Sequence, residues 1–191
     1  MIKAIIFDCF GVLIGRGFHA TYRIAGGDPE RDNDFIKDML DRANLGQISE
    51  DAFHEAITAR LGMSLDAYHQ VVANAEQQNL ELLDYIVQLR KTYKTAILSN
   101  VNRGVLEYRF SQEQLQKCFN VIVASGEVGI VKPDPAIYHL AADKLGVEPE
   151  ACIFIDDHEQ YCRAARDVGM QAILYKDFPQ VKTELEQLLQ N

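Results

Sequence analysis

The chain has 191 residues, of which 48% are hydrophobic and 25% charged, as in an ordinary soluble globular protein. Its net charge is 19 − 28 = −9, which disfavours non-specific binding to nucleic acid or to anionic lipid. No apolar run approaches the roughly 20 residues that span a bilayer, and the apolar opening is too short for a signal peptide. We therefore expect a cytoplasmic protein that binds neither nucleic acid nor a membrane.

Four cysteines agree with a reducing compartment, because Cys9, Cys118, Cys152 and Cys162 form no CxxC pair. Three of them lie in apolar segments, which is typical of reduced thiols that pack in a core. Cys9 adjoins an aspartate, so a reactive thiol is a second interpretation. Packing is the interpretation that we prefer.

The first predicted element is a buried strand over residues 4–7, which ends at Asp8. Gly11 allows a tight turn just after this strand, and ligands of parallel α/β sheets bind at the carboxyl edge of the strands. A second acid would be wanted two residues after such an aspartate, and Phe10 stands there instead. The segment therefore predicts a carboxylate nucleophile without the second acid that would be wanted beside it.

A block without strand candidates follows, over residues 15–88. We expect helices over residues 32–44, 50–61, 65–75 and 80–93. Ser49 is a suitable N-cap and Gly62 a suitable residue just past a helix end. The block predicts a helical cap over the strand ends, and its last helix crosses back to the second strand of the core.

The rest of the chain alternates short apolar runs with helical patterns. Strands are expected over residues 95–98, 121–124, 152–155 and 172–175. Helices are expected from Pro135 to Gly146, from about His158 to Gly169, and over residues 181–189. This alternation predicts an α/β fold with a doubly wound parallel sheet.

Polar residues follow four of the five predicted strands and would meet at one edge of the sheet. They are Asp8, Ser99, Asn100, Lys132, Asp156 and Asp157. Together they favour phosphoryl transfer, in which a carboxylate attacks phosphorus and forms an aspartyl-phosphate. Asp8 is the candidate nucleophile, and Lys132 is a candidate catalytic residue that binds phosphoryl oxygens and holds Asp8 ionised. Ser99 and Asn100 are candidate donors to the substrate.

A cation must separate the phosphate from the carboxylates, because anions repel one another. The candidate ligands are the Asp8 carboxylate, the Phe10 backbone carbonyl, Asp157 and also Asp156. These hard oxygen donors suit Mg²⁺, with water completing an octahedron. Adjacent acids such as Asp156 and Asp157 after a buried strand are unfavourable unless a cation offsets them.

In these motifs the sequence resembles the haloacid dehalogenase-like (HAD) superfamily of hydrolases. The matching stretches are residues 5–13, 97–100, 129–138 and 153–157, and residues 45–49 resemble a segment of its helical caps. The resemblance covers essentially the whole chain and implies a Rossmann-like core, a C1-type helical cap, an Asp8 nucleophile and a Mg²⁺ site. It places the core at residues 1–14 and 89–191 and the cap at residues 15–88.

Two positions depart from the family pattern. Phosphatases of the family carry an aspartate where this chain has Phe10, and that aspartate protonates the leaving group and then activates water. Its loss costs about 10²–10⁴ in rate, less for acyl or aryl phosphates, whose leaving groups are stable anions. His158 and His19 are the candidates to replace it. Tyr161 stands where related chains often carry asparagine.

Three functions are consistent with this sequence. The first is a phosphatase that acts on a small phosphorylated metabolite, such as a sugar phosphate or an acyl phosphate. Dehalogenases of the superfamily carry an aromatic residue at the place of Phe10, and Arg16, Arg23 and Arg31 of the cap are possible anion binders. The acids Asp156 and Asp157 would repel a haloacid carboxylate, however. A catalytically weak binding or regulatory protein is the third, and the sequence leaves the substrate, a protein partner and the oligomeric state open.

Overall fold

The computed structural model describes residues 1–15 and 17–190, so Arg16 lies outside the described residues. Five parallel strands form one sheet in the order β3-β2-β1-β4-β5. They are β1 (Ala4–Phe7), β2 (Lys94–Ser99), β3 (Val121–Ala124), β4 (Cys152–Asp156) and β5 (Gln171–Leu174). The predicted α/β fold with a doubly wound parallel sheet is confirmed.

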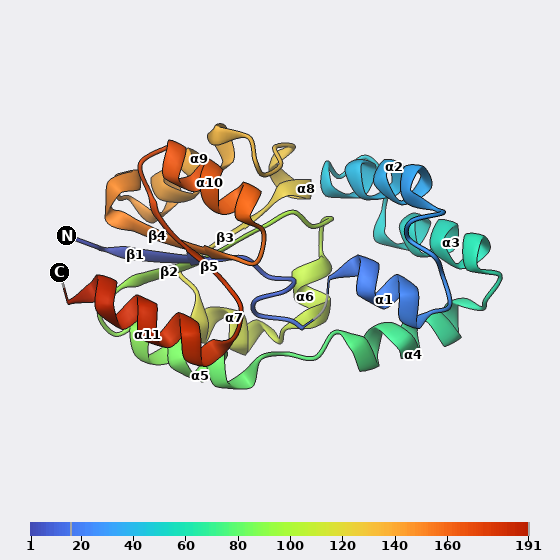
Figure 1. The fold of residues 1–191 in the computed structure, drawn as a ribbon, viewed down its shortest axis with the longest axis horizontal. Helices are drawn as coiled ribbons and strands as arrows, with labels where there is room; N and C mark the ends of the chain where they lie inside the picture. The colour runs from blue at the N-terminus through green and yellow to red at the C-terminus, as the bar shows by residue number, and fades with distance from the viewer. Residues whose placement is uncertain (16, 191) are drawn as a thin grey trace.

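Helices cover both faces of the sheet, which explains why the strands are continuous apolar runs (Figure 1). One face carries α5 (Leu80–Leu89), α7 (Gln112–Cys118) and α11 (Phe178–Leu189), and the other carries α9 (Pro135–Leu145) and α10 (Glu159–Asp167). Side chains alternate between the two cores: Ile5 and Phe7 pack on the first, Ala4 and Ile6 on the second. A short 3₁₀ helix, η1 (Pro149–Ala151), precedes β4.

Of the helices between β1 and β2 in the described part of the chain, the first four lie beyond the carboxyl ends of the strands, whereas α5 packs on the sheet (Figure 1). They are α1 (Phe18–Ile24), α2 (Asn33–Asn44), α3 (Glu50–Leu61) and α4 (Leu65–Ala75). They enclose a third apolar cluster of their own, in which Tyr22, Ile57 and Tyr68 are almost fully buried. The helical insertion expected after the first strand is therefore present.

The predicted helices agree with the structure where their caps are strong. The Ser49 hydroxyl accepts a hydrogen bond from the Ala52 backbone N–H at 3.1 Å, and Gly62 ends α3 in the left-handed conformation. The helix expected to reach residue 93 ends at Leu89, because the Lys94 backbone N–H already pairs with the Lys3 carbonyl at 2.9 Å.

Short helices were the elements that the sequence pattern missed. Besides α1 and α7, they are α6 (Val105–Arg109) and α8 (Ser125–Val128). Helices of four to seven residues span too few turns to show an apolar period. The C-terminal helix also begins earlier than expected, at Phe178, where Asp177 caps it.

The division into a core of residues 1–14 and 89–191 and a cap of residues 15–88 stays a prediction. One helix within the predicted cap, α5, packs in the same apolar cluster as the sheet through Leu82 and Ile86. None of the helices in the described part of the chain has the length and apolar character that crossing a membrane requires.

The four cysteines are buried free thiols. Burial and the neighbouring Asp8 carboxylate raise the pKa of the Cys9 thiol well above its usual value. A thiol with a raised pKa holds little of the reactive thiolate at neutral pH. This supports packing over reactivity as the role of Cys9.

Candidate active site

The turn after β1 brings Asp8 against the end of β4. Gly11 in this turn has φ of +93°, and a Cβ atom there would lie 2.2 Å from an Asp157 carboxylate oxygen. Only glycine adopts this conformation without strain and leaves room for that carboxylate. The turn therefore depends on Gly11 both for its backbone and for the close approach of Asp157.

Lys132 lies at the centre of the site. Its ammonium group is 2.8 Å from an Asp8 oxygen and 2.6 Å from an Asp156 oxygen, and its side chain is 1% exposed. Burial alone would lower the pKa of Lys132, but the Asp8 and Asp156 carboxylates raise it above the ordinary lysine value. Lys132 is therefore a buried cation that contacts both carboxylates.

Carboxylate oxygens of Asp8, Asp156 and Asp157 lie within 4.8 Å of one another. Burial and the Asp8 charge raise the pKa of Asp156 to about 6, although Lys132 opposes the shift, and the same two causes raise the pKa of Asp157. One ammonium group thus does not fully offset three carboxylates. Their hard oxygen donors fit a divalent cation such as Mg²⁺, as the sequence predicted.

Two further residues hold Lys132, and sequence analysis assigned neither role. The Asn100 side chain donates to the Lys132 carbonyl at 2.9 Å and accepts from the Lys132 backbone N–H at 2.8 Å. The Tyr161 ring lies 4.8 Å from the Lys132 ammonium group, at cation–π distance. Tyr161 stands out in the sequence as a departure from the family pattern, but only its place beside Lys132 shows what it contacts.

A cavity of about 510 Å³ opens over these residues, and we call it the catalytic cavity. Its lining includes Asp8, Phe10, Ser99, Asn100 and Lys132. The structure thus brings the predicted nucleophile, phosphate-binding residues and acids together. That Ser99 and Asn100 contact a substrate, and that the Phe10 carbonyl binds the metal, stay predictions.

The two histidines proposed as substitute acids both line the catalytic cavity. The His158 Nε2 atom is 4.0 Å from an Asp157 oxygen, and its side chain is 67% exposed. Burial, Arg23 and His158 lower the pKa of His19, which keeps its ring neutral at pH 7. Of the arginines expected to bind anions, Arg23 lines the cavity, whereas Arg31 instead pairs with Asp32 at 3.0 Å.

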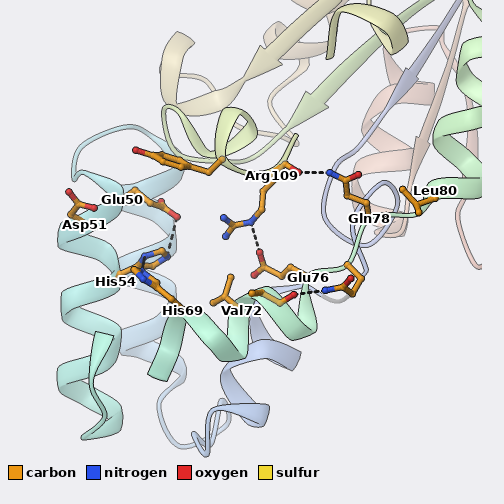
Figure 2. A pocket seen from close by; sticks show the side chains of 12 residues that line it. Glu50, Asp51, His54, His69, Val72, Glu76, Gln78, Leu80 and Arg109 are labelled. Carbon is orange, nitrogen blue, oxygen red and sulfur yellow. Dashed lines mark hydrogen bonds and ion pairs between the residues drawn. The ribbon is translucent and has the colours of Figure 1, made fainter. Parts of the chain in front are cut away.

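A second cavity, of about 620 Å³, meets the catalytic cavity at a shared wall. The wall consists of Glu50, His54, Val72, Glu76 and Arg109, all of which line both cavities. Figure 2 shows that its polar side chains are paired, with Arg109 pointing toward Glu76 and His54 toward Glu50. The distances are 2.7 Å from Arg109 Nε to Glu76 and 3.2 Å from His54 Nε2 to Glu50. Sequence analysis did not single out any residue of this wall, because its members are up to 59 positions apart.

Comparison with known proteins agrees with the resemblance that the sequence motifs show. The sequence model of the haloacid dehalogenase-like hydrolases matches residues 2–169. The bifunctional epoxide hydrolase 2 of Sus scrofa is 35% identical over 115 residues, which are 58% of this chain but 21% of that protein. The D-ribitol-5-phosphate phosphatase of Bacteroides thetaiotaomicron is 24% identical over 99% of both chains.

A solved structure shares the fold. It is that of a HAD family enzyme from Bacteroides thetaiotaomicron in complex with magnesium and inorganic phosphate, with a TM-score of 0.73 and 23% identity. The match covers 95% of this chain and 99% of that one. The chain thus spans nearly the whole length of two of these proteins and about a fifth of the epoxide hydrolase.

Proposed function

Because the chain belongs to the haloacid dehalogenase-like hydrolases, we propose that it is a Mg²⁺-dependent phosphatase of small phosphorylated molecules. The observation that carries this proposal is the position of Lys132, between Asp8 and Asp156 at the base of a cavity. A buried cation between two carboxylates is an arrangement that prepares one carboxylate to attack an anion. The relative named as a ribitol phosphate phosphatase and the neighbour that holds magnesium and phosphate support it.

The reaction would begin with attack of an Asp8 oxygen on phosphorus, opposite the leaving group. Lys132 orients Asp8 and offers its charge to the phosphoryl oxygens, and Ser99 donates its hydroxyl to the same group. Asp8, Asp156, Asp157 and the Phe10 carbonyl would hold Mg²⁺, which supplies positive charge between the phosphate and the carboxylates when bound. Water then releases phosphate from Asp8.

Hydrolysis of p-nitrophenyl phosphate tests this function, because its leaving group needs no protonation. We expect release that requires Mg²⁺ and that falls at least about 10³-fold in Asp8→Asn, since removing a nucleophile has effects of this order or larger. Asp143→Asn is the matched control, because Asp143 is exposed on α9. Release that persists in Asp8→Asn, or that needs no divalent cation, would contradict the proposal.

Phe10 favours one second candidate, a haloacid dehalogenase, because halide leaves without a proton. The three carboxylates of the site weigh against it, since they would repel the carboxylate of a haloacid. Chloride release from 2-chloropropionate, measured beside phosphate release, discriminates the two activities. A binding protein without turnover would show neither.

A further inference from the structure

We propose that His54 and His69 form a second metal site, which takes a divalent cation that imidazole binds well, such as Zn²⁺ or Co²⁺. Both histidines line the second cavity, which Asp8, Asp156 and Asp157 do not line. His54 belongs to α3 and His69 to α4, so a bound ion would join these two helices. The inference does not depend on the proposed phosphatase function.

The two rings meet through their nitrogen atoms. His69 Nε2 lies 3.2 Å from His54 Nδ1, and the ring planes are inclined at 66° (Figure 2). Two nitrogens that bind one tetrahedral Zn²⁺, each at about 2.0–2.1 Å from the ion, are roughly 3.3 Å from each other. The two histidine nitrogens therefore already have the spacing of two ligands of one ion.

Glu50 determines which nitrogen of His54 is available to a metal. His54 Nε2 lies 3.2 Å from a Glu50 oxygen, one turn earlier on α3. When Nε2 donates its proton to this carboxylate, the lone pair of the neutral ring is on Nδ1, which is the atom that faces His69. A carboxylate on the far nitrogen of a metal-binding histidine also orients the ring and raises its basicity.

One of the two ligands is fixed and the other is free to adjust. The His54 side chain is buried, and its ring packs edge to face on Tyr68 with centroids 5.4 Å apart. A ligand that is already held in place loses little conformational entropy when the ion binds. His69 is exposed, so its ring can turn toward an ion that enters from the cavity.

The second cavity supplies negative charge and room for further ligands. Its lining carries three carboxylates, those of Glu50, Asp51 and Glu76, against the single guanidinium group of Arg109. An excess of acidic groups raises the local concentration of cations.

In the described part of the chain, no third histidine, cysteine or carboxylate offers an atom within 4.8 Å of both His54 Nδ1 and His69 Nε2. The remaining coordination positions of the ion would therefore be filled by water from the cavity, as at open zinc sites.

The chemistry of the ligands separates this site from the carboxylate site. Imidazole nitrogen suits Zn²⁺, Co²⁺, Ni²⁺ and Cu²⁺, whereas Mg²⁺ takes hard oxygen ligands. Isothermal titration with ZnCl₂ in excess Mg²⁺ therefore tests the proposal. We expect one Zn²⁺ to bind per chain through the histidines, and this binding to persist in Asp8→Asn, which weakens the carboxylate site.

Variants assign the binding to residues. His69→Ala should weaken Zn²⁺ binding at least about 10²-fold and Glu50→Gln about 10–100-fold, because an outer partner of a ligand is worth 10–100-fold in metal affinity and a lost ligand more. Zn²⁺ should raise the Tm of the wild type but not that of His69→Ala. His139→Ala is the matched control, since His139 is an exposed histidine of α9.

A spectrum separates metal binding from a simple contact between the rings. Co²⁺ bound in place of Zn²⁺ should give a visible absorption band that is lost in both His54→Gln and His69→Ala. If His54→Gln does not fold, His69→Ala carries the test, because His69 is exposed. A hydrogen bond between the rings without a metal would give a wild type that binds no Zn²⁺, and this result overturns the proposal.

Two other results would also overturn it. Zn²⁺ binding that is lost in Asp8→Asn but kept in His69→Ala would place the ion on the carboxylates of the catalytic cavity. Equal weakening in His69→Ala and His139→Ala would show that exposed histidines bind Zn²⁺ without a defined site. Hydrolysis of p-nitrophenyl phosphate is measured separately, so failure of the phosphatase function would leave the zinc site standing.

Discussion

At the scale of single residues, the site depends on a few atoms that come unusually close together. The Lys132 ammonium group reaches two carboxylates, and Asn100 bonds to both the N–H and the carbonyl of Lys132. Gly11 leaves the space that the Asp157 carboxylate fills. These contacts determine where charge lies in the site and leave little room for substitution.

Gly11→Ala is expected to abolish Mg²⁺ binding, because its Cβ atom would lie 2.2 Å from an Asp157 oxygen. The left-handed backbone adds strain of about 1–3 kcal/mol. Gly26→Ala is the matched control, with φ of +91° and nothing within 4 Å of its Cβ position. The Mg²⁺-induced rise in Tm should vanish in Gly11→Ala and persist in Gly26→Ala. An equal Mg²⁺-induced rise in Tm in both variants would show that the structure accommodates the added Cβ atom beside Asp157 and still binds Mg²⁺.

The residues of the site were accessible to sequence analysis to different degrees. Asp8 and the pair Asp156–Asp157 could be found because they follow apolar strands directly. The clamp of Asn100 on Lys132 joins positions 32 apart, and no local pattern marks it. Tyr161 is visible as an unusual residue, but its contact with Lys132 arises only when α10 packs on the sheet.

At the scale of elements, one buried carboxylate connects three parts of the helical insertion. Asp32 is fully buried, and accepts hydrogen bonds from the Tyr22 hydroxyl at 2.8 Å, from Arg31 at 3.0 Å and from Arg60 Nε at 3.1 Å. Tyr22 belongs to α1 and Arg60 to α3. The hydrogen bonds from Arg31, Arg60 and Tyr22 lower the pKa of Asp32, so this side chain stabilises the packing of the helices in its ionised form.

Asp32→Asn should therefore destabilise the protein in a pH-dependent way. A carboxylate whose pKa is lowered by folding contributes stability above its unfolded pKa of about 4, and loses it as the pH falls toward the folded value. The difference in Tm between the wild type and Asp32→Asn should be largest at pH 5–7 and shrink below pH 4. Asp34→Asn, an exposed neighbour on α2, is the control. A difference that does not change with pH would contradict the role of the charge.

At the scale of the whole molecule, the insertion is tied to the sheet by contacts over the carboxyl edge. The Ser125 hydroxyl after β3 donates to the Asn44 carbonyl of α2 at 2.6 Å. Arg109 at the end of α6 pairs with Glu76 at the end of α4, in the wall between the two cavities (Figure 2). The shape of the catalytic cavity therefore depends on how the two parts are joined.

Arg109→Leu should destabilise the protein by about 3–5 kcal/mol, because it leaves the buried Glu76 carboxylate unpaired. Burial already raises the pKa of Glu76 while Arg109 opposes the shift, so the variant raises it further. A raised folded-state pKa means that stability falls as the pH rises through it. The loss measured by urea unfolding should therefore be larger at pH 8 than at pH 5.

The double variant Glu76→Leu/Arg109→Leu completes the cycle for this ion pair. The double variant should recover part of the stability that Arg109→Leu loses, because no unpaired buried charge remains. Lys37→Met is the surface control and should change stability by less than about 0.5 kcal/mol. Additive effects of the two single substitutions would show that Arg109 and Glu76 do not interact across the two parts of the molecule.

The sequence by itself determined the order of strands and helices along the chain, the helical insertion after β1, and the acids and lysine at the strand ends, because each has a local signature in apolar period, caps or adjacency. It did not determine the short helices α1, α6, α7 and α8, which span too few turns for a period. Tertiary structure alone decided that Lys132 lies between Asp8 and Asp156, 124 and 24 positions away. It also decided that Glu76 meets Arg109 and that the Phe18 and Phe53 rings meet edge to face. Such contacts depend on how elements pack across the sheet edge, and packing brings together side chains that no spacing in the sequence relates.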